Sequence, residues 1–299
     1  MSKLNIEIKD YEENFESEEC DSHLALIIRP EREKFCLEAV CIQGDGIKTL
    51  DYAPKSKSKL RRGILCSLGD ISKELGKIIE YFLQNINDGL RIIEIYFPYQ
   101  LLYTDVDNWH IINDAKQSVP ILRDFDIVIH ASDRITGVYN FRYLKDGWKN
   151  LVEVLSLEPN SDIIQQNIET VNRTDKLEWH QIENNLKDKI GMKLAKPLLD
   201  NKSEQEKFIQ AILNGGVPFA FWLKCKPSRN RKLEQIDCYL TSECLNNNLQ
   251  QLIKHVYEMR SKAYRSKKPE QDLGYHLGFV CDIPDKIIKI KQLQSRLQL

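Results

Sequence analysis

Carboxylates gather after a strongly apolar run at residues 91–97 and could bind a hard cation. The side chains are Asp105, Asp107 and Asp114, and oxygen ligands of this kind suit Mg²⁺ or Ca²⁺. Together with His130, Asp105 and Asp107 would also suit a divergent metal-dependent nuclease or peptidase, provided that all three share one cleft. Aspartates in connections are more often turn formers or solvated charges, so we predict no metal site and no catalytic residue.

The chain contains eight cysteines, which could form a zinc site or supply a nucleophile. No CxxC pair occurs, and Cys36 and Cys41 have no nearby histidine at metal-ligand spacing. We therefore interpret the thiols as reduced, small core side chains. A Cys–His pair would require His130 or His276 to meet a thiol in the folded chain, and no glycine-flanked cysteine marks a nucleophile. We interpret His130 as a core residue whose ring nitrogens are satisfied.

Positive charge is concentrated in a short stretch that ends with Lys59, Arg61 and Arg62. Such a cluster could hold the phosphates of a nucleotide signal, which makes a nucleotide sensor an alternative function. We favour a solvated loop, because no stacking aromatic residues are interleaved with the charges. The sequence contains no GxxxxGK[ST], GxGxxG, HExxH or GxSxG motif, which argues against an ordinary NTPase or hydrolase. We predict no cofactor.

Composition describes a globular protein without a strong field of either sign. The 299 residues are 42% hydrophobic, and the formal net charge is −1. No whole-protein field would attract nucleic acid or an anionic membrane. No apolar stretch reaches the roughly 18 residues that cross a bilayer, so we expect a cytoplasmic protein without a nucleic-acid or membrane partner. Residues 1–22 are heavily acidic and are predicted to form a flexible tail.

The elements that must position these residues follow an α/β pattern. Apolar runs without helical periodicity predict strands, and amphipathic spacing predicts helices. Predicted strands lie at 24–28, 35–42, 47–52, 91–97, 127–131, 163–171, 217–223, 236–240 and 277–281. Predicted helices lie at 70–87, 141–152, 179–190, 203–214 (with Ser203 and Glu206 as a capping box), 245–257 and from Pro284 onwards.

These elements predict an α/β fold in which helices flank a mixed sheet. Residues 23–66 would form a β-rich N-terminal hairpin and meander, and residues 67–299 would form the main α/β domain after the acidic tail at 1–22. We favour one continuous domain, while a separate lobe for 23–66 remains an alternative.

Short motifs in a fixed order resemble a known family. They are IIEIYFPYQLLYTDVDNW, ILRDFDIVIHASDRI, GVPFAFWLK and GFVCDIPDKIIKIKQ. Their order is similar to that of VMAP-C, the C-terminal domain of the vWA-MoxR-associated proteins, from about residue 65 onwards. The matching positions are Glu94, Phe97, Pro98, Leu101, Leu102, Val106, Asp107, Trp109, Asp133, Arg134, Gly216, Pro218, Trp222 and Pro284.

The resemblance implies a non-enzymatic coupling or sensing module of a prokaryotic conflict system used in antiviral defence. Its partners would be a MoxR-type ATPase, a vWA protein, or a trypsin-like or caspase-like peptidase. We expect the effector to lie on another polypeptide, because no peptidase or effector-associated segment precedes the domain here. A partner surface is predicted from residue types that dominate interfaces, namely Trp109, Asp107, Asp133, Arg134, Tyr99 and Trp148. The alternative is that these aromatics are core residues and that Asp133 and Arg134 form an internal ion pair.

Overall fold

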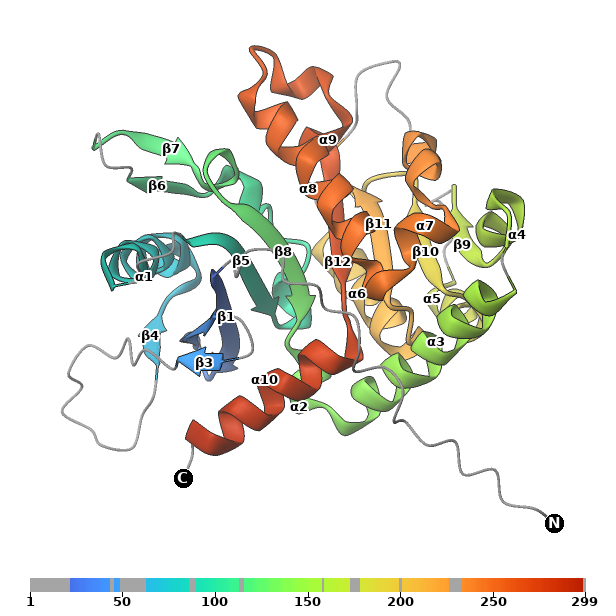
Figure 1. Cartoon of the computed structure of the whole chain (residues 1–299), viewed down its shortest axis with the longest axis horizontal. Coiled ribbons are helices and arrows are strands. Elements are labelled where there is room, and N and C mark those ends of the chain that lie inside the picture. Colours follow the sequence, from blue (N-terminus) through green and yellow to red (C-terminus); the bar gives the residue numbers. More distant parts are fainter. Residues whose placement is uncertain are drawn as a thin grey trace.

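The computed structural model shows two sheets side by side, with helices around and between them (Figure 1). It describes residues 22–297 except 44–45, 49–62, 86–89, 113–115, 158, 173–177, 199–200 and 226–232. The predicted α/β class with mixed sheets and flanking helices is confirmed. The predicted acidic tail falls outside the described residues, apart from Ser22.

The first sheet takes its strands from the N-terminal half of the chain. Its order is β3-β2-β1-β5-β8, and β4 pairs with β2. The strands are β1 (Ser22–Glu31), β2 (Lys34–Gln43), β3 (Gly46–Lys48), β4 (Ile64–Cys66), β5 (Leu90–Phe97) and β8 (Asp126–Ala131). The predicted hairpin is confirmed as the antiparallel pair β1–β2. Because β1 also pairs in parallel with β5, the N-terminal strands continue the sheet of the main domain.

Alternating side chains give the first sheet two apolar faces. Leu24, Leu26 and Ile28 of β1 join one core cluster, which also contains the apolar stripe of α1 (Ile71–Asn85). Ala25 and Ile27 point to the opposite face, which is covered by α10 (Pro284–Leu297). The same alternation places Glu94 and Tyr96 of β5 on the α10 side. A sheet buried on both faces forces any charge on those faces to find a partner.

The second sheet is built from repeated strand–helix units. Its order is β12-β11-β10-β9, with three parallel strands and an antiparallel β12. The strands are β9 (Ile168–Val171), β10 (Gly191–Leu194), β11 (Phe219–Leu223) and β12 (Leu277–Cys281). Helices α5 (Trp179–Leu186) and α6 (Lys202–Gly215) connect the parallel strands. All five residues of β11 are buried, as the run without polar residues predicts.

The remaining elements cover the sheets or extend their edges. A small hairpin is formed by β6 (His110–Ile112) and β7 (Ser118–Pro120). The other α-helices are α2 (Asp133–Thr136), α3 (Val138–Ser156), α4 (Ser161–Gln166), α7 (Ser242–Leu245), α8 (Gln250–Arg265) and α9 (Leu273–His276). Short 3₁₀ turns lie at Leu68–Asp70, Tyr99–Leu101, Val106–Asn108, Ile121–Arg123, Leu233–Tyr239, Asn247–Leu249 and Pro269–Gln271.

Three local predictions are wrong. The segment predicted as a strand at 236–240 is a 3₁₀ helix, Leu233–Tyr239, because its apolar residues pack onto the second sheet without a strand to pair with. The first half of the predicted strand 163–171 is α4, capped by Asn160. Helix α6 is capped by Asn201, whose side chain accepts from the Glu204 amide, so the predicted capping box at Ser203 is not formed.

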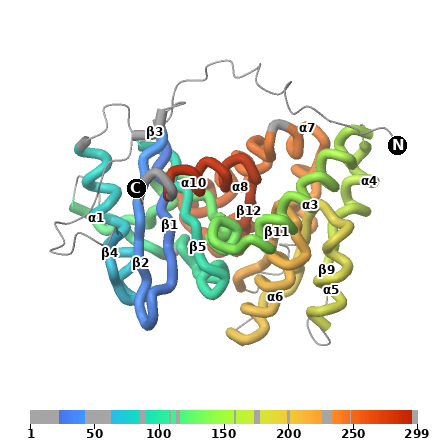
Figure 2. Tube along the Cα trace, turned by 90° about the horizontal axis from the view of Figure 1, so that it is seen from below, coloured from blue at the N-terminus to red at the C-terminus, as the bar shows by residue number. Residues whose placement is uncertain are grey.

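The two sheets meet where β8 lies against β12. Helix α10 follows β12 and extends over the first sheet (Figure 2). The largest apolar cluster contains residues from both sheets, including Ile129 of β8 and Val280 of β12. Helix α3 also approaches α6 closely, since a Cβ atom on Gly147 would lie 2.1 Å from the Gly216 carbonyl oxygen. Within the described part of the chain, no helix has the length and apolar content needed to cross a membrane.

Candidate functional site

The segment between β5 and β6, residues 98–109, lies between the two sheets and contacts both. Its Tyr103 hydroxyl donates to the Leu223 carbonyl oxygen of β11 and accepts from the Leu198 amide, both at 3.2 Å. The Tyr103 ring stacks on Trp222 with the ring centres 5.7 Å apart. Burial raises the pKa of Tyr103 to about 12, so its hydroxyl stays protonated and keeps both bonds. The 98–109 segment is therefore fixed to the second sheet.

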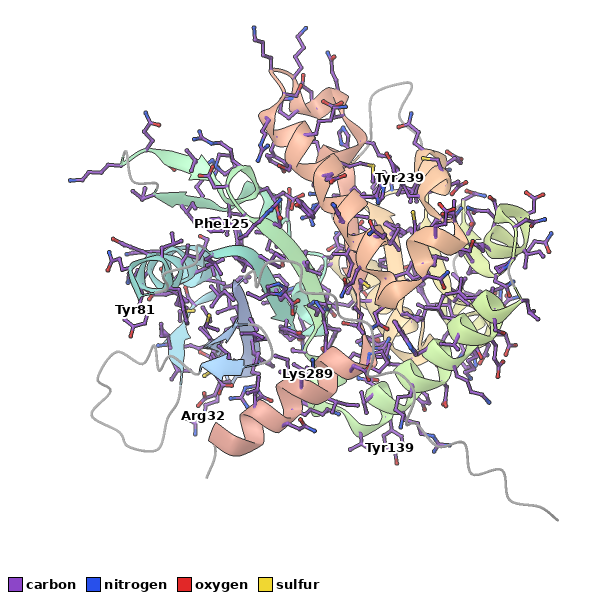
Figure 3. The ribbon with its side chains drawn as sticks, viewed as in Figure 1. Arg32, Tyr81, Phe125, Tyr139, Tyr239 and Lys289 are labelled. Atoms are coloured by element: carbon purple, nitrogen blue, oxygen red, sulfur yellow. The ribbon has the colours of Figure 1, made fainter. Side chains whose placement is uncertain are left out.

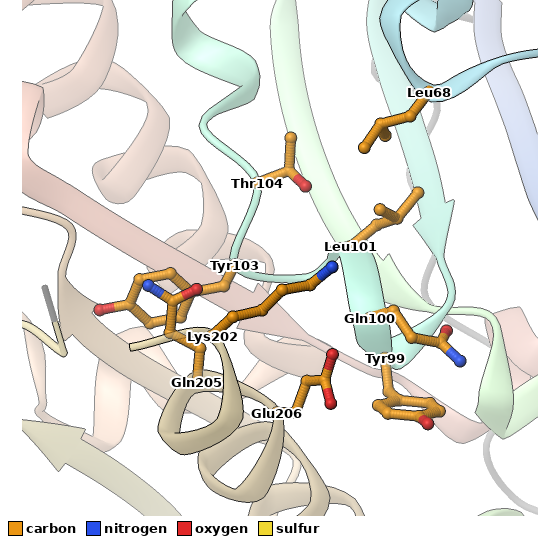
Figure 4. Close-up of a pocket in the computed structure, with 9 residues that line it drawn as sticks. All are labelled: Leu68, Tyr99, Gln100, Leu101, Tyr103, Thr104, Lys202, Gln205 and Glu206. Carbon is orange, nitrogen blue, oxygen red and sulfur yellow. The ribbon is translucent and has the colours of Figure 1, made fainter. Parts of the chain in front are cut away.

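A pocket with a volume of about 300 Å³ opens between this segment and the start of α6. It is lined by Leu68, Tyr99, Gln100, Leu101, Tyr103, Thr104, Lys202, Gln205 and Glu206. Figure 4 shows Lys202 and Glu206 extending from α6, with the Lys202 side chain reaching toward the 98–109 segment. Aromatic rings, amides and one charge of each sign suit a small polar ligand or a short peptide segment. The pocket walls come from segments connected to both sheets, so the shape of the pocket depends on the relative position of the two sheets.

Asp133 connects the pocket wall to the junction of the sheets. Its carboxylate accepts the Tyr99 backbone amide at 2.7 Å, and the neighbouring Ser132 amide donates to the Phe97 carbonyl oxygen at 2.7 Å. Burial raises the pKa of Asp133, although the Tyr99 amide and Arg134 work in the opposite direction. Two sequence-predicted site residues, Tyr99 and Asp133, are thus in direct contact.

Arg134 is fully buried and holds together three separate elements. Its guanidinium donates to the carbonyl oxygens of Asn140 at 2.6 Å and Leu213 at 2.8 Å, and its Nε lies 3.5 Å from Asp282. Leu213 is in the last turn of α6, so Arg134 satisfies carbonyls that a helix end leaves without partners. Burial lowers the pKa of Arg134, while Asp282 opposes that shift. Arg134 thus forms an internal ion pair, but its carboxylate is Asp282, which follows β12, and not Asp133 as the sequence-based alternative predicted.

A buried charge cluster continues from Asp282 to α10. We call Glu94, His130, Arg134, Asp282 and Lys286 the junction cluster. His130 lies between two carboxylates, with Nδ1 3.6 Å from Asp282 and Nε2 3.8 Å from Glu94. Lys286 of α10 forms an ion pair with Glu94. Burial would raise the pKa of Glu94, but Lys286, His23 and His130 outweigh it and hold that pKa well below its usual range.

His130 differs from its prediction in one respect. It is a core residue with no exposed surface, and it stacks on Tyr96 with ring centres 4.6 Å apart. Within the described residues, however, neither ring nitrogen has a hydrogen-bond partner. The prediction of satisfied ring nitrogens is therefore wrong, because both flanking carboxylates sit beyond hydrogen-bond distance and already bind Arg134 and Lys286.

A second buried cluster, which we call the Asp107 cluster, fixes the other end of the 98–109 segment. Asp107 is fully buried and pairs with Arg260 of α8 and with Lys224, which follows β11. Lys224 also contacts Asp105 at 2.8 Å. Both aspartates are therefore engaged by cations, and His130 belongs to the junction cluster instead. The arrangement does not bring Asp105, Asp107 and His130 into one hydrolytic site, and no metal-binding group of three or more His, Cys, Asp or Glu is found in the described ranges.

The two predicted tryptophans are partly buried. Trp109 packs edge-to-face on Phe97 with ring centres 5.8 Å apart, and Trp148 packs against the second sheet. Both mainly support the core. The basic residues Lys59, Arg61 and Arg62 lie outside the described residues, as does Asp114.

Comparison with known families now identifies the domain. Residues 34–284 match the vWA-MoxR associated protein C-terminal domain, VMAP-C. The chain belongs to the VMAP-C family. Membership associates it with vWA-MoxR conflict systems. Among curated proteins and solved structures, nothing matches this chain.

Several residues of the VMAP-C motifs converge on the junction between the sheets. The Asp282 amide donates to the Pro218 carbonyl oxygen at 2.8 Å, and Arg134 approaches the Val217 carbonyl oxygen at 3.5 Å. The glycine before these residues, Gly216, has a φ of 78°, a left-handed conformation that favours glycine at a helix end. Several motif residues of the VMAP-C domain therefore lie in the segments that join its two sheets.

The sequence did not indicate which residues pair with Asp107 and Arg134. Lys224 and Arg260 lie 117 and 153 residues from Asp107 in the chain. Asp282 directly follows the fully apolar strand β12, and Asp133 lies two residues beyond the last residue of β8. Two carboxylates at such strand ends were the available signal that buried cations would be needed nearby.

Proposed function

We propose that this VMAP-C domain is a non-enzymatic coupling module, which receives a signal at the pocket between the sheets and passes it to a separate effector. Family membership supports this role. The main structural support is a continuous path from Tyr99 at the pocket to Asp133, and from its chain neighbour Arg134 to Asp282. From Asp282 the path continues through the junction cluster to Lys286 of α10. Such a path gives a ligand a physical route to a distant surface.

A second route begins at the same pocket. Helix α6 presents Lys202 and Glu206 to the pocket in its first two turns and presents the Leu213 carbonyl oxygen to Arg134 in its last turn. A ligand that moves α6 or the 98–109 segment must therefore change the surroundings of Arg134. Because a buried, hydrogen-bonded charge tolerates few positions, small shifts there favour one discrete arrangement over another. Coupling between sites of this kind is typically about 1–3 kcal/mol.

The output surface is proposed at the start of α3, directly after the helix that carries Arg134. Val138 and Tyr139 are 79% and 71% exposed, so the first turn of α3 presents two neighbouring apolar side chains to solvent. Figure 3 shows Tyr139 projecting away from the body of the protein. Exposed apolar residues next to a regulated helix suit a protein partner. We propose that a MoxR-type ATPase, a vWA protein or a peptidase of the same system binds there.

Co-purification of the tagged chain with the vWA and MoxR proteins of its system tests the output surface. We expect Tyr139→Ser to reduce partner recovery at least about tenfold, a change of about 1.4 kcal/mol. Leu157→Ser is the matched control, because Leu157 is 75% exposed at the opposite end of the same helix. Equal recovery with the two variants would remove the proposed surface.

A substitution in the pocket tests whether the pocket receives the signal. Lys202→Glu reverses an exposed charge at the pocket and leaves the junction cluster intact. We expect it to abolish the change in partner affinity that follows phage challenge, while unchallenged affinity stays as in the wild type. If the challenged and unchallenged affinities of this variant still differ as in the wild type, the pocket does not receive the signal.

A further inference from the structure

The pairing of β11 with β12 brings a thiol and an imidazole together just beyond the strand ends. Leu223 lies opposite Leu277 in the antiparallel register, and the Lys224 amide donates to the His276 carbonyl oxygen at 2.8 Å. Cys225 follows this pair, and its Sγ lies 2.8 Å from His276 Nδ1. The two residues are 51 positions apart in the sequence, so the register of the sheet creates the contact.

The second nitrogen of His276 fixes which atom can accept a proton. His276 Nε2 lies 2.8 Å from the Glu270 carbonyl oxygen, which can only accept a hydrogen bond. Nε2 therefore carries the hydrogen of the neutral ring, and Nδ1 presents its lone pair to the Cys225 thiol. A nucleophile, a base and a group that orients the base are thus arranged in line.

The Cys225 thiol is accessible, but its surroundings favour the protonated form. His276 is buried at 4% exposure, whereas Cys225 is partly exposed, so a small reagent can reach the sulfur. Burial raises the pKa of Cys225, while Lys224 lowers it and Asp105 raises it. The thiol therefore keeps its proton at neutral pH unless His276 accepts it, which makes the imidazole the element on which reactivity depends.

We propose that Cys225 and His276 form a redox-reactive site whose substrate class is small hydroperoxides. The Cys225 proton passes to His276 Nδ1, and the thiolate sulfur attacks one peroxide oxygen. An S–O bond forms while the O–O bond breaks, and the leaving oxygen takes the proton from His276. The products are a sulfenic acid and water or an alcohol; sulfur loses two electrons and the peroxide gains two. This displacement needs a thiolate and a proton donor, and the pair supplies both.

Cys238 provides an internal control, because it is exposed but donates to the Gln235 carbonyl oxygen at 3.2 Å instead of to an imidazole. The full chain is treated with hydrogen peroxide, sulfenic acid is trapped with dimedone, and each cysteine is quantified by mass spectrometry. We expect Cys225 to be labelled at least about tenfold faster than Cys238. Equal or slower labelling of Cys225 overturns the proposal, and this comparison requires no variant.

His276→Gln tests the base. A glutamine amide nitrogen can still donate to the Glu270 carbonyl oxygen, but it places no basic nitrogen beside the thiol. We expect the labelling rate of Cys225 to fall at least about tenfold while that of Cys238 is unchanged. Thermal unfolding shows whether the variant is folded, and an unchanged Cys225 rate in the folded variant overturns the role of His276.

Discussion

Replacing Arg134 with methionine tests whether the junction cluster holds the two sheets together. Methionine has a similar length but no charge, so it removes the partner of Asp282 and leaves that carboxylate buried at 2% exposure. It also removes the donors to the Asn140 and Leu213 carbonyl oxygens.

The expected loss in the free energy of unfolding is about 3–5 kcal/mol, the usual effect of removing one member of a buried ion pair. The lost hydrogen bonds from a charged donor would each contribute about 1.5–3 kcal/mol. These contributions overlap with the ion-pair value, so they are not added to it. A loss of this size is a large part of the about 5–15 kcal/mol that typically stabilises a domain.

Urea denaturation followed by tryptophan fluorescence and by circular dichroism measures this loss. Arg142→Met is the control, since Arg142 is exposed on α3 and its substitution should change stability by no more than about 0.5 kcal/mol. The double variant Arg134→Met with Asp282→Asn should recover at least about 1 kcal/mol, because asparagine can still accept the Ala131 amide that Asp282 accepts at 2.9 Å. A loss below about 1 kcal/mol for Arg134→Met, or no recovery in the double variant, would refute the reasoning.

Three further predictions concern acid stability, packing and the pocket wall. The pKa of Glu94 is held below 4.5 in the folded protein. The ionised Glu94 therefore stabilises the fold at neutral pH, and this contribution is lost as pH falls from about 4.5 through the lower folded pKa. Glu94→Gln should make the stability in urea less dependent on pH in that acid range. Gly147→Ala should destabilise the protein by about 2 kcal/mol or more in thermal unfolding, because its Cβ would overlap a backbone carbonyl, whereas Gly76→Ala, whose Cβ would meet its nearest neighbour at 3.9 Å, should be neutral or stabilising by up to about 1 kcal/mol. Asp133→Asn should change stability by less than about 0.5 kcal/mol at pH 7, since the amide oxygen still accepts the Tyr99 amide, while Asp133→Ala should cost about 1–2 kcal/mol in the same denaturation assay; equal effects of the two substitutions would exclude that hydrogen bond as the reason for the aspartate.

Much of the fold is predictable from local patterns. The strand at 217–223 has no polar residue and is buried throughout, and the helix of residues 71–85 follows its apolar stripe. Elements set by tertiary packing are less predictable. Asn248 and Leu249 adopt left-handed φ values of 56° and 60° at the start of α8, although neither is glycine. No local sequence pattern predicts that turn. The helix predicted from residue 245 therefore starts too early, since α8 begins at Gln250.

The candidate site shows the same division between local and distant information. The strands predicted at 91–97 and 127–131 indicate that Asp107, Asp133 and Arg134 lie in the segments that follow them. The alternation of side chains along β5 predicts that Glu94 shares a face with Tyr96. Which cation meets which carboxylate depends on the packing of the two sheets, and that packing joins residues more than 100 positions apart. The Cys225–His276 contact likewise depends on the register of β11 with β12.

The position of the junction cluster in the chain has a consequence for the order of assembly. Asp282 and Lys286 come after every strand that the structure describes, yet they neutralise Arg134 and Glu94, which are made much earlier. During synthesis, which proceeds at about 5–20 residues per second, the first sheet can therefore form before its buried charges have partners. Those charges must stay hydrated until Asp282 and Lys286 emerge. Closure of the two sheets is thus a late folding event, and a ribosome-bound chain that stops before residue 282 should keep Arg134 accessible to solvent.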